Sequence, residues 1–186
     1  MSFGAYMNKP ITGQQSKGGA SADRKTFLTV LHVDDDPNDT ELLVAAATKA
    51  KVPFILRRVE NAEQAIAYVS GAGEYTDRET YCFPALVLLD LKMPRNTGFE
   101  VLQYIRAHSE LAHLPVVVLS GSELPEDIRR ASEAGASSYL VKPLSFDSLV
   151  EMVKKLNTVW FAHAGAPALE KKVRPFPDAT QNRREA

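Results

Sequence analysis

The stretch ALVLLD, residues 85–90, decides the fold, because an unbroken apolar run ends there at an acid. A strand that is apolar at every position is typical of the centre of a parallel sheet, where helices cover both faces. Five strand-like runs are spaced about 23 to 31 residues apart, which suits successive βαβ units. These runs begin near Leu28, Phe54, Ala85, Pro115 and Ser138. The sequence therefore predicts an α/β fold built on a parallel sheet.

Helix-like segments separate the apolar runs. Asp36 is placed to cap a helix whose first turn contains Pro37, a residue that suits the first helical position. Four further segments show helical spacing after a residue that can open a helix. They begin at Asn61, Gly98, the Leu124-Pro125 pair and Ser145.

The composition excludes several classes of protein. The 22 Lys and Arg against 23 Asp and Glu give no overall field that would favour nucleic acid or an anionic membrane. Cys82 is the one cysteine of the sequence, which excludes an internal disulfide framework. No apolar run approaches the roughly 18 residues that a membrane span requires. We therefore expect a cytoplasmic protein with neither a nucleic-acid nor a membrane partner.

Three zones follow one another along the 186 residues. Residues 1–26 are rich in Gly, Ser and Gln without an apolar period, and we expect a flexible arm. Residues 27–161 alternate strand and helix patterns and are long enough for one domain. The sequence AGAP then breaks the last helix, and we expect residues 162–186 to form a flexible tail.

Five reactive side chains follow the apolar runs. Because the carboxyl ends of parallel strands meet at one edge of the sheet, residues far apart in the sequence converge there. We therefore expect three carboxylates, a hydroxyl and an ammonium to share one site. They are Asp34, Asp35, Asp90, Ser120 and Lys142.

These residue types fit a metal-assisted phosphoryl-acceptor site. Clustered carboxylates repel one another unless a cation compensates, and Mg²⁺, for which Mn²⁺ can substitute, prefers such hard oxygen ligands. Asp90 is the candidate nucleophile that forms an acyl phosphate, while Lys142 and Ser120 bind phosphoryl oxygens. Each also has an ordinary interpretation: residues 34–36 as a solvated capping loop, Lys142 as a solvent-facing lysine and Ser120 as a turn residue.

Four motifs carry a resemblance to a known family. They are LHVDDDP at residues 31–37, LLDLKMP at residues 88–94, VLSG at residues 118–121 and YLVKP at residues 139–143. In this order, with Gly98 after the second, they resemble the receiver domain of two-component response regulators. The resemblance implies a flavodoxin-like fold, in which a doubly wound parallel sheet of five strands in the order 2-1-3-4-5 carries five helices.

The resemblance also implies roles for individual residues. Asp34 and Asp35 would hold Mg²⁺, with Asp35 the more direct ligand, together with Asp90 and the backbone carbonyl of Lys92. Asp90 would be the phosphoacceptor. The phosphoryl group would be bound by Ser120 and Lys142. In the family the bond before the following proline is typically cis, so Pro143 is a candidate for a cis peptide bond.

Switching in receivers involves the hydroxyl residue and an aromatic residue on the fifth strand, here Ser120 and Tyr139. The expected fourth helix has only Ile128, Ala131 and Ala134 as apolar anchors, so it should be held weakly. A weakly held helix suits a switch, although an ordinary exposed helix has the same pattern. Tyr139 equally fits a half-buried strand aromatic.

Two further positions bear on the lifetime of an acyl phosphate. In the family the side chains at the positions of Lys92 and Ser122 flank the path of the hydrolytic water. We expect the cationic head of Lys92 to contact the phosphoryl group or obstruct that water.

Two features make the resemblance more specific: an expanded connection at residues 71–84, and the Trp160-Phe161 end of the last expected helix. Both resemble features of stand-alone receivers that partner phytochrome-type histidine kinases. The connection is longer than most loops between a helix and a strand, which suggests a functional or packing role.

The resemblance implies a single-domain response regulator that signals by protein–protein contact and catalyses only its own phosphorylation and dephosphorylation. Its expected partner is a histidine kinase, with a histidine phosphotransfer protein as an alternative, and a homodimer would form through the fourth helix, fifth strand and fifth helix. A phosphorelay shuttle or a phosphate sink are alternative roles.

Two other classes share part of the pattern. A phosphatase with an aspartate nucleophile normally needs a second acid two residues later, where this chain has Lys92. A receiver-like scaffold that is never phosphorylated usually lacks the acids or the lysine, and this chain has all of them.

Overall fold

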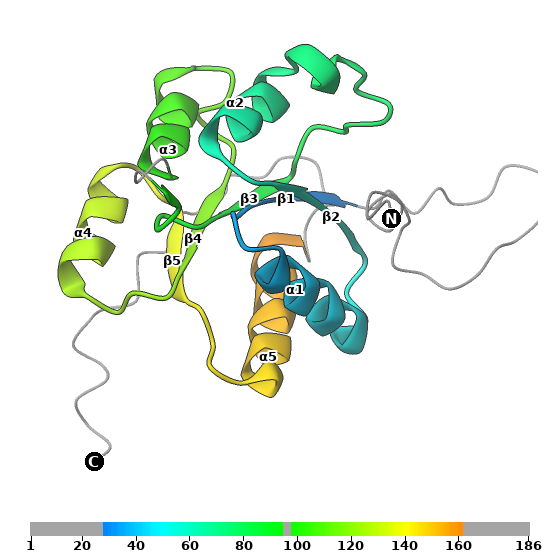
Figure 1. Ribbon diagram of the computed structural model, residues 1–186, viewed down its shortest axis with the longest axis vertical. Coiled ribbons are helices and arrows are strands. Elements are labelled where there is room, and N and C mark those ends of the chain that lie inside the picture. Colours follow the sequence, from blue (N-terminus) through cyan, green and yellow to red (C-terminus); the bar gives the residue numbers. More distant parts are fainter. Residues whose placement is uncertain (1–27, 95–97, 162–186) are drawn as a thin grey trace, which may run out of the picture.

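Five parallel strands form one sheet in the order β2-β1-β3-β4-β5 (Figure 1). The computed structural model describes residues 28–94 and 98–161. The strands are β1 (Leu28–Val33), β2 (Phe54–Val59), β3 (Leu86–Leu89), β4 (Val116–Ser120) and β5 (Ser138–Val141). The predicted flavodoxin-like fold with the strand order 2-1-3-4-5 is confirmed.

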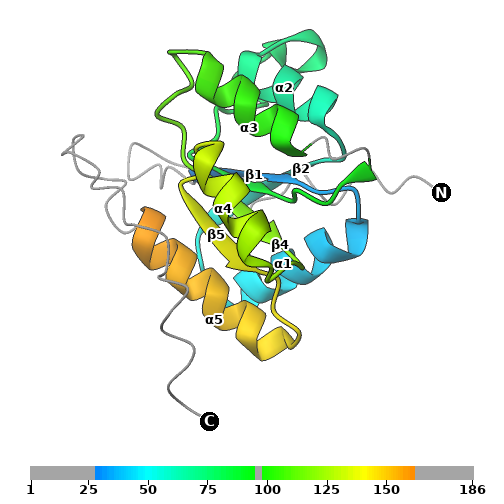
Figure 2. The same cartoon turned by 90° about the vertical axis from the view of Figure 1, so that its left-hand side faces the viewer.

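Helices cover both faces of this sheet. The pair α1 (Pro37–Ala50) and α5 (Phe146–Leu156) packs on one face, and the pair α2 (Ala62–Ser70) and α3 (Gly98–Ala107) packs on the other (Figure 2). The remaining helix, α4 (Pro125–Glu133), lies beside β5 at one side of the sheet. The five helices expected from the sequence are therefore present.

The central strand β3 is buried at all four positions, as its apolar sequence predicts. Its side chains alternate between the two faces, because successive residues of a strand point in opposite directions. Leu86 and Leu88 pack with α1 and α5, whereas Val87 and Leu89 pack with α2 and α3. One strand thus joins both halves of the core and fixes the position of Asp90 at its end.

The predicted helix caps are formed by short polar side chains. Asp36 accepts a hydrogen bond from the Asn38 N–H at 2.8 Å. Asn61 and Ser145 accept equivalent bonds from N–H groups three residues later. Leu124, which precedes α4, has an apolar side chain and cannot form such a cap, so this helix starts with Pro125.

The helix α4 buries little of its surface, as expected. Ala131 is its fully buried residue, and Ile128 packs partly buried against the same core. An apolar contact area this small contributes little free energy, since hydrophobic stabilisation scales with the area removed from water.

The expanded connection at residues 71–84 is a packed structure. After Gly71, which has the left-handed φ of 73° that favours glycine, a 3₁₀ helix runs over Gly73–Thr76. Tyr75 and Tyr81 pack against Tyr68 of α2, with ring centroids 5.0 and 6.1 Å from the Tyr68 ring. Arg78 donates hydrogen bonds to carbonyls at the end of α2. The connection therefore extends the core beside α2.

One expectation is wrong: the Lys142–Pro143 bond is trans, as are all peptide bonds of the described segments. A trans bond is favoured before proline by about 0.5–1 kcal/mol unless packing selects the other isomer. Packing is sparse here, because Pro143 is only partly buried and the Leu144 side chain is fully exposed.

The helix continues beyond α5 as a short π-helix over Asn157–Phe161. The Phe161 ring lies 6.0 Å from that of Phe54, so the end of this helix packs against the start of β2. The predicted flexible arm (residues 1–26) and tail (residues 162–186) lie outside the described residues.

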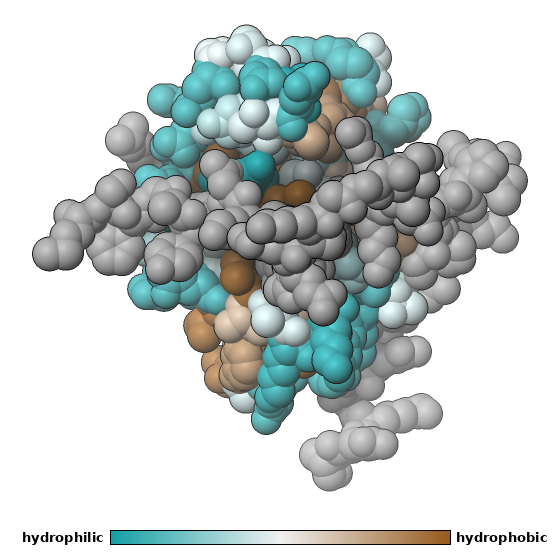
Figure 3. All heavy atoms as spheres, turned by 90° about the vertical axis from the view of Figure 1, so that its right-hand side faces the viewer, coloured by the Kyte–Doolittle hydropathy of each residue, from teal (hydrophilic) through white to brown (hydrophobic). Residues whose placement is uncertain are grey.

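The surface is mixed in character. Figure 3 shows mostly hydrophilic side chains on the upper half of its face and exposed hydrophobic ones in the lower half. Among the described residues, no helix is both long and apolar enough to cross a bilayer.

Gly98 brings α3 against the backbone that follows β3. A Cβ atom added at this position would lie 2.4 Å from the Asp90 carbonyl oxygen and 2.7 Å from the Leu91 Cα. Both are backbone atoms, so neither can turn aside. Only glycine fits where the helix touches the Asp90 segment.

Gly98→Ala should therefore lower the free energy of unfolding by about 1–3 kcal/mol, because the methyl group overpacks a backbone contact. Chemical denaturation measures this change. Gly121→Ala is the matched control, since a Cβ at Gly121 meets no atom of the described chain within 4 Å. Equal stability of the two variants would contradict the role given to Gly98.

Candidate functional site

Three predicted residues from different strands meet at the carboxyl edge of the sheet. The Lys142 Nζ, after β5, lies 2.8 Å from Asp34 Oδ2, after β1, and 2.8 Å from Asp90 Oδ2, after β3. Asp34 is completely buried, and Asp90 is 8% exposed. The parallel topology thus forms one charged cluster from residues that are 52 to 108 positions apart.

A third carboxylate completes this cluster. The Asp39 Oδ2 lies 2.5 Å from Lys142 Nζ. Asp39 was not among the predicted site residues, because an acid in the first turn of a helix is common and has an ordinary explanation, the stabilisation of the helix dipole. A signal was present, since that turn directly follows β1 and so lies at the same edge.

The charges in the cluster are unequal, with three carboxylates around one ammonium. Burial alone lowers the pKa of Lys142, but the hydrogen bonds to Asp34, Asp39 and Asp90 outweigh burial and raise this pKa above its usual value. Burial raises the pKa of Asp34, and hydrogen bonds from Lys142 and from the Asp36 N–H oppose that shift. Lys142 is therefore a firmly charged cation at neutral pH.

Both oxygens of Asp90 are held in place. Oδ2 accepts from Lys142, and Oδ1 accepts from the Lys92 backbone N–H at 2.8 Å. The Asp90 N–H in turn donates to the Val33 carbonyl at 2.9 Å, which ties it to β1. The carboxylate is thus oriented before any ligand arrives.

The loop between β1 and α1 is held by Arg58 at the end of β2. The Arg58 Nε donates to the Asp34 carbonyl at 3.1 Å, and Nη2 donates to the Asp35 carbonyl at 2.8 Å. Its side chain is 8% exposed and also pairs with Glu60. This contact was missed in the sequence, because Arg58 stands in a mixed strand that resembles an exposed sheet edge.

The carboxylate of Asp35 is not among the partners of Lys142. Asp35 is exposed, whereas the carboxylates that contact Lys142 belong to Asp34, Asp39 and Asp90. Asp34, by contrast, is also held within the loop, because its Oδ1 accepts a hydrogen bond from the Asp36 N–H at 2.9 Å. Of the two predicted neighbouring acids, only Asp34 contacts Lys142.

His32 lies under the cluster inside the core. Its Nδ1 is 2.9 Å from the Thr40 hydroxyl of α1, and its Nε2 is 3.5 Å from Asp34 Oδ2. Burial lowers the pKa of His32 to about 3, with Lys142 and Arg58 adding to the shift. The imidazole is therefore neutral at physiological pH and links β1 to α1.

Ser120 and Tyr139 belong to a second group of contacts, toward α4. Ser120 is buried at the end of β4, and its Oγ accepts from the Ser122 N–H at 3.4 Å. The Tyr139 hydroxyl donates to the Ser122 carbonyl at 2.9 Å. The Ser122 hydroxyl donates to Asp127 Oδ2, in the first turn of α4, at 2.5 Å. Ser122 therefore connects β4, β5 and α4.

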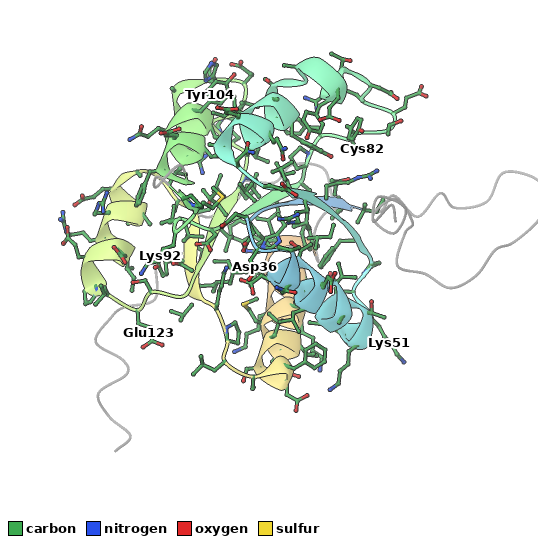
Figure 4. The ribbon with its side chains drawn as sticks, in the orientation of Figure 1. Asp36, Lys51, Cys82, Lys92, Tyr104 and Glu123 are labelled. Carbon is green, nitrogen blue, oxygen red and sulfur yellow. The ribbon has the colours of Figure 1, made fainter. Side chains whose placement is uncertain are left out.

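Lys92 borders this second group. Its Nζ is 3.9 Å from Asp127 Oδ2, so the head reaches toward α4. Figure 4 shows Lys92 near α4 and Asp36 at the start of α1. Asp127 is another residue that the sequence did not reveal, because an acid in the first turn of a helix has an ordinary explanation.

The acids suit a divalent cation by charge and donor type. Mg²⁺ and similar ions prefer carboxylate oxygens, and Asp34, Asp39 and Asp90 exceed the one ammonium in charge. In the described segments no three His, Cys, Asp or Glu side chains already form a ligand group. Lys142 is one reason why no ligand group is formed, since it hydrogen-bonds the Oδ2 atoms of both Asp34 and Asp90.

Comparison with known proteins gives one consistent family. The sequence profile described as the response regulator receiver domain matches residues 30–154. Response regulator Rcp1 of Synechocystis is 30% identical over 139 residues, which are 75% of this chain and 92% of that protein. The probable methanogenesis regulatory protein FilR2 of Methanothrix harundinacea is 42% identical over 84 residues. Those residues are only 54% of FilR2, so the match spans about half of that relative.

Solved structures agree with this result. Response regulator RPA3017, from red light signalling of R. palustris, has a TM-score of 0.72 and 35% identity, and the match covers 77% of this chain and all of that one. The phosphorylated cyanobacterial phytochrome response regulator RcpA has a TM-score of 0.68 and 31% identity, with the same coverage. A Mn²⁺-bound form of Rcp1 has a TM-score of 0.65 and 30% identity over 76% of this chain and 99% of its own.

Arg58→Lys should lower the free energy of unfolding by about 1–3 kcal/mol, because a lysine cannot donate to both loop carbonyls and leaves a buried acceptor unpaired. Chemical denaturation measures the change. Arg129→Lys, which alters two exposed ion pairs on α4, is the control and should change stability by less than about 0.5 kcal/mol. An Arg58→Lys variant with unchanged stability would show that the loop keeps its conformation without these hydrogen bonds.

Proposed function

Since the chain belongs to the response regulator receiver domain family, we propose that it accepts a phosphoryl group on Asp90 from a histidine kinase in a Mg²⁺-dependent reaction. The observation that carries the proposal is the Asp90 carboxylate, which belongs to a side chain that is 11% exposed and is held by Lys142 and the Lys92 N–H. Orientation of this kind supplies most of what phosphoryl transfer needs from a protein.

In the transfer, an Asp90 oxygen forms the new O–P bond while the N–P bond of a phosphohistidine donor breaks. The donor imidazole keeps the electron pair of that bond and takes up a proton. Lys142 then donates to a phosphoryl oxygen as a point charge, and the Ser120 hydroxyl donates to another. Lys142 already contacts Asp90, and Ser120 ends β4, the strand next to β3 in the sheet.

A divalent cation suits the same edge. Asp34, Asp35 and Asp90 would hold it with the backbone carbonyl of Lys92, and the cation would neutralise charge on the phosphoryl oxygens. The Mn²⁺ in the similar Rcp1 structure supports a divalent ion, and Mn²⁺ would substitute for Mg²⁺. For this role the exposed carboxylate of Asp35 has the freedom to turn toward an ion.

The proposed partner is a phytochrome-like histidine kinase. The similar structures of RPA3017 and RcpA, whose names refer to red light signalling and to phytochrome, support this choice. A histidine phosphotransfer protein would be a further partner if the chain acts as a phosphorelay shuttle. A phosphate sink would need no such protein. The chain would catalyse only its own phosphorylation and dephosphorylation.

Output would pass through the contacts around Ser122. A Ser120 hydroxyl drawn toward a phosphoryl group changes its bond with the Ser122 N–H, and Ser122 holds Tyr139 and Asp127. Because α4 buries little apolar area, a small change in free energy can shift its position. A homodimer through α4, β5 and α5 would use the adjacent groove, which is lined by Leu140, Pro143 and Met152.

Incubation with acetyl phosphate and Mg²⁺ should add one phosphoryl group to the protein, and Asp90→Asn should abolish the addition, because an amide oxygen is a far weaker nucleophile. Intact mass spectrometry measures the adduct, and a chelator should prevent it. Asp77→Asn is the control, since Asp77 is an exposed carboxylate in the connection before β3.

Two results would overturn the proposal. A protein that takes up no phosphoryl group with Mg²⁺ present would be a scaffold. One that rapidly releases phosphate from many phosphate esters would be a phosphatase with an aspartate nucleophile.

Lys92→Ala should speed hydrolysis of the phosphorylated protein about threefold to tenfold, since the cationic head no longer contacts the phosphoryl group or obstructs water. Decay of the phosphorylated form after removal of the donor gives the rate. Lys92→Arg keeps the charge and should retain most of the lifetime. An identical rate in Lys92→Ala would remove this role.

A further inference from the structure

The Lys142 ammonium has three protons and three carboxylate partners. Nζ lies 2.8 Å from Asp34 Oδ2, 2.8 Å from Asp90 Oδ2 and 2.5 Å from Asp39 Oδ2. Two of these partners come from the ends of strands, whereas Asp39 belongs to α1. Its side chain is 34% exposed and that of Lys142 is 23% exposed, so Asp39 lies on the outer side of the cluster.

We propose that Asp39 is a positioning residue that holds the Lys142 ammonium at the site while Asp34 and Asp90 turn to a divalent cation. The inference rests on the proposed function, because that function makes Asp34 and Asp90 cation ligands. It adds a residue that touches neither the cation nor the phosphoryl group and acts through Lys142.

The need for such a residue follows from the contacts. Lys142 bonds the Oδ2 atoms of both Asp34 and Asp90, so an ammonium and a divalent cation compete for the same two carboxylates. A Lys142 without a further partner would be left unpaired in a partly buried position when the cation binds, which costs free energy. Asp39 removes part of that cost, since it keeps one charged hydrogen bond to Lys142.

The position of Asp39 suits this task. It stands at the third residue of α1, in a turn fixed by the Asp36 cap and by the bond between Thr40 and the buried His32. The carboxylate therefore comes from a rigid helix start rather than from the loop that carries Asp34 and Asp35. It can stay on Lys142 when that loop adjusts.

An acid in the first turn also stabilises a helix by its charge alone. Asp36→Asn provides the matched control for this effect. It removes one negative charge from the same helix start, asparagine caps a helix as well as aspartate does, and the Asp36 carboxylate bonds only Asn38 among the described contacts.

The test is a double-mutant cycle on the full chain, with the dissociation constant of Mg²⁺ measured by isothermal titration calorimetry. Asp39→Asn should raise this constant about threefold to tenfold, and Asp36→Asn less than about twofold. In a Lys142→Met background, Asp39→Asn should also change it less than about twofold, because the residue that Asp39 holds is gone.

A second measurement needs no variant. In the metal-free protein, NMR should show the Lys142 ammonium protons protected from exchange with water, and this protection should persist when Mg²⁺ saturates the site. Loss of protection on Mg²⁺ binding would show that Asp39 does not retain the ammonium, and would overturn the inference.

The remaining outcomes separate this inference from the proposed function. Equal weakening by Asp39→Asn with and without Lys142 would show that Asp39 acts by its charge alone. If the wild-type protein binds Mg²⁺ and Asp39→Asn binds it with the same dissociation constant, only the inference is overturned. Wild-type protein that binds no Mg²⁺ would overturn both.

Discussion

The site depends on one ammonium group held among three carboxylates at the end of a parallel sheet. Lys142 reaches Asp34, Asp39 and Asp90 because β5, β1 and β3 all end at the same edge and α1 begins there. One positive charge cannot balance three negative ones, so the edge keeps excess negative charge in a partly buried place. That imbalance favours a divalent cation, and the fold creates it from residues that are distant in the sequence.

The surroundings of this cluster differ on its two sides. Toward β2 and α1, Arg58 holds the loop carbonyls, and His32 binds Thr40 inside the core. Toward α4, Ser122 hydrogen-bonds with Ser120, Tyr139 and Asp127, and the helix itself has one fully buried residue, Ala131. A firmly held charged cluster next to a helix that buries little surface is an arrangement in which a local change can alter a surface without unfolding the domain.

Much of this was predictable because the strand pattern dictates the topology. An apolar β3 flanked by runs at βαβ spacing requires a parallel sheet, and a parallel sheet brings Asp34, Asp90 and Lys142 together. Asp39 and Asp127 are harder to recognise, since each stands in the first turn of a helix, where an acid has an ordinary explanation. For Asp39 the position directly after β1 was the available signal, whereas the reach of Asp127 depends on how α4 docks. The role of Arg58 was not recognisable in the sequence, because the groups it contacts are backbone carbonyls rather than side chains. The trans bond before Pro143 depends on local packing, about which the sequence pattern carries no information.

The packed connection before β3 has a practical consequence. It carries the chain's one cysteine, Cys82, whose exposed thiol Figure 4 labels in the connection before β3. Asp90 follows the other end of β3, so it lies at the opposite edge of the sheet. Tyr68 anchors this segment by donating to the Cys82 carbonyl at 3.1 Å. A maleimide dye would therefore attach at a single, well-anchored point, away from the acidic edge, on the unaltered sequence. The molecule thus comes with its own attachment point for fluorescence or tethering work on its encounters with other proteins.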